Sequence, residues 1–138
     1  LLRIAPKELA YFFSKKIDAR IYDLDMTEKI IRLSNLSIGQ RVWLYKNALA
    51  LIHPSKDEGF GLTLIEATYF NCPVIASDIL VLRETCPDAT FFRPDDPLEL
   101  TDLLENIFKK GPIHKKTRSS FSFKKMAETT YNQYKETL

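Results

Sequence analysis

Short apolar runs alternate with amphipathic segments along most of the chain, and this alternation predicts an α/β fold. Strands are predicted at residues 1–4, 30–33, 49–53, 74–77 and 89–92. Helices are predicted at residues 6–24, 37–45, 62–70, 97–110 and 121–138, with 19–22 also compatible with extended structure. Such alternation is typical of a parallel sheet with helices on both faces.

Capping residues mark the ends of several predicted helices. Ser37 and Gln40 form a capping-box pattern, in which each side chain bonds the other residue's backbone amide. Asp96 followed by Pro97 combines an N-cap acid with proline at the first helical position. Asn71 suits a left-handed residue at a helix C-terminus. These signals make the boundaries of three helices specific.

The stretch D-E-G-F-G-L-T-L-I-E joins the predicted strand at 49–53 to the predicted helix at 62–70. Glu58 and Glu66 bracket seven residues, among them Gly59 and Gly61. A strand, a glycine-bearing loop and a helix in succession present backbone N–H groups at a helix N-terminus, which attracts phosphate. Ligands of such sheets bind at the carboxyl ends of the strands. We therefore expect a ligand site at this loop.

Composition bounds the function only loosely. The 138 residues suffice for a single domain, with 109–120 as a basic linker and 121–138 as a closing helix. A net charge of +2 is too small to indicate nucleic acid binding, and no apolar run approaches the ~20 residues of a membrane helix. The two cysteines and two histidines lack metal-ligand spacing, so we expect no metal and a reducing cytoplasm. The start at Leu1 suggests a piece of a longer protein.

The run A-L-A-L-I-H-P-S-K-D-E-G-F-G-L-T-L-I-E-A, followed by C-P-V-I-A-S-D, resembles a known family. It is similar to the C-terminal domain of retaining family-four glycosyltransferases of the GT-B fold, which carry an E-x(7)-E signature. The resemblance extends from Ile30 to the closing helix. It implies a Rossmann-like parallel sheet that forms one half of a GT-B fold. It also implies transfer of a hexose from a nucleotide sugar to an acceptor, without a metal or cofactor.

The resemblance assigns roles to residues of the central stretch. Glu58 would be the catalytic carboxylate that faces the donor hexose, and Glu66 would accept hydrogen bonds from the ribose hydroxyls. Carboxylates suit vicinal hydroxyls because they offer two acceptor oxygens. The other expected donor-binding residues, several acting through backbone amides, are Gly59, Phe60, Gly61, Leu62 and Thr63. Retention in this family is usually explained by front-face attack, so no protein nucleophile is expected.

The chain also departs from the family pattern. Thr63 stands where proline is usual, and Asn71 stands where glycine is usual. The family's Arg/Lys loop, which neutralises the diphosphate, and its N-terminal Rossmann-like domain have no counterpart here. We therefore expect an N-terminal Rossmann-like domain as a partner, either in the same polypeptide or in another one. We also expect the isolated fragment to be inactive. The basic linker could contact anionic lipid at the inner face of a membrane, or it could be a solvated connector.

Plainer interpretations of the same residues remain open. Thr63-x-x-Glu66 is also a capping box, Glu58 could be a solvated loop carboxylate, and the glycines could be ordinary turn residues. His53 more often packs or caps than reacts. At the level of the chain, the alternatives are a non-catalytic fragment that binds a nucleotide or nucleotide sugar, and an interaction domain that has lost its ligand.

Overall fold

The structure is a computed structural model that describes the backbone of residues 7–111 and 123–137. Contacts between residues divide the chain after Leu36 into two compact units. The strand predicted at residues 1–4 lies outside the described residues.

The first unit contains one long helix, α1 (Lys7–Asp23). It confirms the first predicted helix, and residues 19–22 are helical rather than extended. The strand predicted at residues 30–33 is wrong, because these residues form irregular structure. A strand needs a hydrogen-bonded neighbour, and none of the described residues of this unit is in a strand. Ile31 is 80% exposed, and Arg32 instead pairs with Asp18 of α1 at 3.1 Å.

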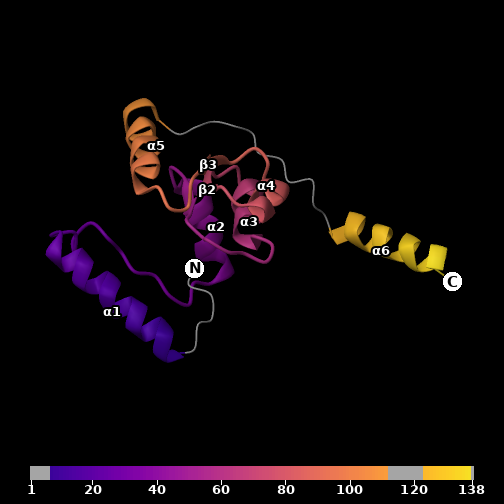
Figure 1. Cartoon of the computed structure of the whole chain (residues 1–138), viewed down its shortest axis with the longest axis horizontal. Coiled ribbons are helices and arrows are strands. Elements are labelled where there is room, and N and C mark those ends of the chain that lie inside the picture. Colours follow the sequence, from indigo (N-terminus) through magenta and orange to yellow (C-terminus); the bar gives the residue numbers. More distant parts are fainter. Residues whose placement is uncertain (1–6, 112–122, 138) are drawn as a thin grey trace. The chain divides into compact units, whose positions relative to one another are not determined.

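The second unit contains a parallel sheet, as predicted (Figure 1). Its strands, in spatial order, are β1 (Leu51–His53), β2 (Val74–Ser77) and β3 (Thr90–Phe92). Its helices around the sheet are α2 (Ile38–Asn47), α3 (Leu62–Tyr69), α4 (Leu80–Thr85) and α5 (Pro97–Lys110). Both strand pairs are parallel, so His53, Ser77 and Phe92 end at the same edge of the sheet.

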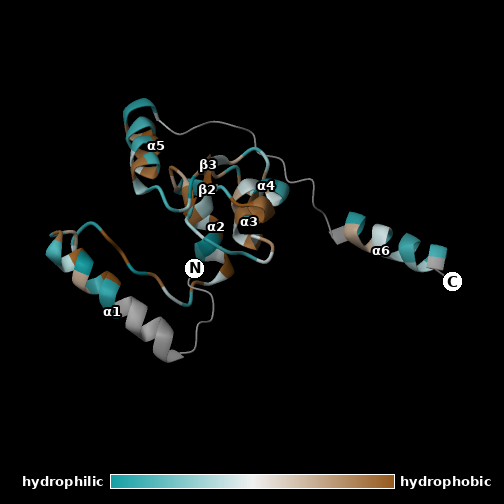
Figure 2. Ribbon diagram, in the orientation of Figure 1, coloured by the Kyte–Doolittle hydropathy of each residue, from teal (hydrophilic) through white to brown (hydrophobic). Residues whose placement is uncertain are grey.

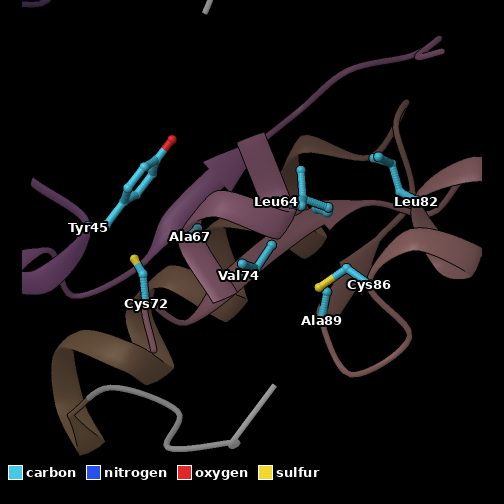
Figure 3. Packing of buried hydrophobic residues seen from close by; sticks show 9 residues of the cluster. Tyr45, Leu64, Ala67, Cys72, Val74, Leu82, Cys86 and Ala89 are labelled. Carbon is cyan, nitrogen blue, oxygen red and sulfur yellow. The ribbon is translucent and has the colours of Figure 1, made fainter. Parts of the chain in front are cut away.

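Helices cover both faces of this sheet. Successive residues of β2 point to opposite faces, and all of them are buried, as a central strand requires. Val74 and Ala76 join the apolar cluster that includes residues of α2, α3 and α4, part of which Figure 3 shows. Ile75 packs on the other face with Phe92 and with Ile107 of α5. Figure 2 shows the corresponding apolar colour along most of α3.

The helix ends follow the predicted signals. Ser37 and Gln40 form both bonds of the capping box, and the Asp96 carboxylate accepts from two amides of α5. Asn71 is left-handed, with a φ of 59°. The linker boundary is wrong in one respect, because Lys109 and Lys110 belong to the last turn of α5. Most of the predicted linker lies outside the described residues, and α6 (Phe123–Thr137) shows that the segment predicted as the last helix is helical.

The short helix α4 was not predicted, and it supports the central loop. Leu82 of α4 is fully buried, and an added Cβ on Gly61 would lie 2.8 Å from its Cδ2. The Thr85 hydroxyl of α4 lies 2.7 Å from the Phe60 carbonyl oxygen and 2.8 Å from that of Val81. Its single proton is therefore shared between loop and helix. These contacts hold the loop against α4.

We predict that Gly61→Ala destabilises the chain by about 1–3 kcal/mol, because Gly61 has a φ of +78° and an added Cβ would force the buried Leu82 side chain to shift. Gly39→Ala is the matched control, since nothing lies within 4 Å of its Cβ position and Gly39 is helical. It should stabilise the chain by about 0.5–1 kcal/mol. Urea denaturation compares the two variants with the wild type. Equal midpoints for both would contradict the role given to Gly61.

Candidate functional site

The candidate site lies where β1 ends and α3 begins, at the carboxyl edge of the sheet. Gly61 is the N-cap of α3 and adopts the left-handed conformation that turns the chain into the helix. The Leu64 amide donates a hydrogen bond to the Gly61 carbonyl oxygen at 2.9 Å, which closes the first turn of α3. Within the described residues the amides of Leu62 and Thr63 have no recorded acceptor. They are available to an anion, and the helix dipole favours negative charge there.

Glu58 is held by its neighbours at the mouth of this turn. Its Oε2 lies 3.3 Å from His53 Nε2, and its Oε1 accepts from the Gly59 amide at 3.1 Å. The Glu58 side chain is only 17% exposed. The alternative of a solvated loop carboxylate is therefore wrong. His53 is the last residue of β1, so its contact with Glu58 ties this carboxylate to the sheet.

Glu66 projects from α3 toward α2. Its Oε2 accepts a hydrogen bond from the Tyr45 hydroxyl at 3.0 Å and lies 3.6 Å from Arg41 Nη1. The capping-box alternative is wrong, because Gly61 is the N-cap and Thr63 lies inside the helix. Glu66 remains 43% exposed, so it can reach a ligand. The two carboxylates of the E-x(7)-E pattern are thus each held by a partner that the pattern did not name.

The cations of the loop region are paired with carboxylates. Lys56 contacts Asp95, and Arg83 pairs with both oxygens of Asp78. The Arg83 guanidinium lowers the pKa of Asp78 through these hydrogen bonds. Both pairs lie in exposed segments, where ion pairs exchange readily with solvent and ligands.

Two further observations concern the chemistry of the region. In the described part of the chain, no three His, Cys, Asp or Glu side chains gather into a metal-binding group. None of the described helices has the length and apolar character needed to span a membrane.

Sequence reasoning missed four of the supporting side chains. Arg41 and Tyr45 lie one turn apart on α2, and this spacing does place them on one face of the helix. The sequence pattern does not predict that this face of α2 contacts Glu66. Thr85 and Leu82 were missed because α4, which is short and lacks a side-chain N-cap, was not predicted.

The family model described as "Glycosyl transferases group 1" matches residues 13–124. The chain belongs to this family. Residues of this glycosyltransferase chain are 36% identical over 96 residues to the O-antigen chain mannosyltransferase RfbU of Salmonella typhimurium. They are 38% identical over 82 residues to the serotype-specific mannosyltransferase WbdA of Escherichia coli. Identity to mouse alpha-1,3/1,6-mannosyltransferase ALG2 is 25% over 101 residues.

These relatives are much longer than the glycosyltransferase chain described here. The RfbU match covers 69% of this chain and 27% of RfbU, and the WbdA match covers 59% and 10%. The ALG2 match covers 72% of this chain and 24% of ALG2. A structural match to sucrose-phosphate synthase from Thermosynechococcus elongatus has a TM-score of 0.71 at 21% identity, covering 88% of this chain and 33% of that one. The expected half of a GT-B fold is confirmed.

Burial and the hydrogen bond to Glu66 raise the pKa of Tyr45 from 10.0 to about 12. We predict that Tyr45 ionises well above pH 10 in an NMR titration of its ring carbons. Because the folded pKa is the higher one, the stability that Tyr45 contributes is complete below pH 10 and is lost as pH rises toward 12. Glu66→Gln should lower the pKa of Tyr45. A pKa of Tyr45 at or below 10.0 would contradict this account.

Proposed function

We propose that the chain is the C-terminal, donor-binding domain of a retaining glycosyltransferase, which transfers a hexose from a nucleotide sugar to an acceptor. One observation carries the proposal: two held carboxylates, Glu58 and Glu66, flank a glycine turn, and the next two amides, those of Leu62 and Thr63, have no acceptor among the described residues. A carboxylate on each side of an anion-attracting turn suits a ligand with a diphosphate between two hydroxyl-bearing rings. A nucleotide sugar has this arrangement.

Each residue of the site receives a role in this proposal. Glu66 accepts hydrogen bonds from the ribose hydroxyls, and Glu58 faces the donor hexose and the positive charge that develops at its reacting carbon. The loop and helix-start residues that line the donor are Gly59, Phe60, Gly61, Leu62 and Thr63. Among them the amides of Leu62 and Thr63 bind donor oxygens, because they have no acceptor within the described residues. The departing diphosphate gains negative charge in the transition state, so amides aimed at it lower the barrier.

The hexose, the partner and the location are parts of the same proposal. Mannose is the first hexose to test, because RfbU, WbdA and ALG2 are all named mannosyltransferases. An N-terminal Rossmann-like domain, in cis or in trans, would supply the acceptor site and further cations. No metal or other cofactor takes part. The reaction would take place in the cytoplasm, at the inner face of a membrane if the acceptor is lipid-linked.

The second candidate is a non-catalytic domain that binds a nucleotide or nucleotide sugar. The two candidates share the donor site and differ in transfer. A mannosyl transfer assay on the chain with and without an N-terminal domain separates them.

We predict that UDP, GDP or ADP binds the chain in calorimetric titrations and that Glu66→Gln weakens binding about tenfold or more, because a charge-assisted hydrogen bond is lost. Glu105→Gln is the control, since this carboxylate lies on α5 and pairs with Lys109. It should leave the affinity unchanged. Absence of binding by all three nucleotides would overturn the proposal, as would an equal loss in both variants.

We further predict that Glu58→Gln acts on the sugar rather than on the nucleotide. The variant should bind the nucleoside diphosphate as the wild type does, and it should lose about tenfold in affinity for the mannose conjugate of that nucleotide. Competition calorimetry measures both constants. Equal weakening of both ligands would place Glu58 away from the hexose and would contradict its assigned role.

A further inference from the structure

Two side chains of α2 converge on one oxygen of Glu66. Arg41 and Tyr45 are four residues apart, so they lie on the same face of the helix. The Tyr45 hydroxyl lies 3.0 Å from Oε2 of Glu66, and Arg41 Nη1 lies 3.6 Å from the same atom. An ionised carboxylate can only accept, so the tyrosine hydroxyl is the donor. The contact between α2 and α3 therefore includes Glu66, the carboxylate to which the proposed function gives a role in binding.

Tyr45 is itself rigidly placed. Its side chain is 9% exposed, and its ring stacks on Phe70 with centroids 6.1 Å apart and planes 10° apart. Figure 3 shows the ring beside Cys72, with the hydroxyl end directed away from the sulfur. Packing thus fixes the ring, and the ring fixes the position of the hydroxyl. Such a donor restrains an otherwise flexible glutamate.

Arg41 supplies charge beside this hydrogen bond. Its Nε is buried and has no hydrogen-bond partner among the described residues. An unsatisfied buried donor costs free energy, so the position of Arg41 is not explained by its own hydrogen bonds. Its proximity to Glu66 is explained by the attraction between opposite charges. Arg41 therefore reinforces the placement that the Tyr45 hydroxyl sets.

The two carboxylate oxygens of Glu66 differ in their contacts. Within the described part of the chain both recorded contacts go to Oε2, and none goes to Oε1. We propose that Tyr45 is a positioning residue: its hydroxyl anchors Oε2, so that Oε1 is directed to a ribose hydroxyl of the donor. The inference rests on the proposed ribose role of Glu66. Tyr45 acts through Glu66 and does not itself touch the ligand.

The test compares nucleotides with and without the ribose hydroxyls. Tyr45→Phe keeps the ring stacked on Phe70 and removes only the hydroxyl. We expect it to weaken binding of UDP, GDP or ADP about three- to tenfold, the value of one hydrogen bond. Binding of the corresponding dideoxy nucleotide should not change. Tyr69→Phe, at a 79% exposed position of α3, is the control and should change neither affinity.

A double-mutant cycle completes the experiment. If Tyr45 acts through Glu66, adding Tyr45→Phe to Glu66→Gln should cause no further loss. Equal weakening of both nucleotides by Tyr45→Phe would show a merely structural role and overturn the inference. If Glu66→Gln loses affinity for the nucleotide and Tyr45→Phe does not, the inference about Tyr45 is overturned and the ribose role of Glu66 stands. No loss in Glu66→Gln, or no binding to the wild type, would overturn the ribose role together with the inference.

Discussion

The packing of the Gly61 turn against α4 is the constraint on which the site depends. Gly61 has a φ of +78°, which favours glycine, and a Cβ there would lie 2.8 Å from a methyl group of Leu82, so the turn packs directly on the Leu82 side chain of α4. The Thr85 hydroxyl bonds the same loop through the Phe60 carbonyl. This contact fixes where α3 begins. It thereby fixes both the amides at the helix start and the direction in which Glu66 leaves the helix.

The core and the candidate site share residues, so the stability of the fold and the geometry of the site are coupled. Tyr45 belongs to the same apolar cluster as Leu64 and Val74, yet its hydroxyl donates a hydrogen bond to Glu66. His53 completes β1 and also contacts Glu58. The rigidity that the proposed donor site requires therefore comes from the sheet and its covering helices. Substitutions in the core behind the site will move its carboxylates as well as lower stability.

The sequence predicted what local patterns determine and missed what only the fold brings together. The parallel strands, the Ser37–Gln40 capping box and the left-handed Asn71 were predictable, because short-range spacing and residue type determine them. The segment 30–33 has the composition of a strand but lacks a partner strand among the described residues of its unit. The Tyr45–Glu66 bond joins residues 21 positions apart, a distance at which no periodicity operates.

The most direct test of the central claim is an amide NMR titration of the chain with the nucleoside diphosphate that binds. The account predicts the largest shifts at the turn and helix start, residues 58–66, with Leu62 and Thr63 most affected because their amides have no recorded acceptor within the described residues. Smaller shifts should reach α4 through Leu82. Saturable shifts centred elsewhere in the chain, with residues 58–66 unchanged, would contradict the account.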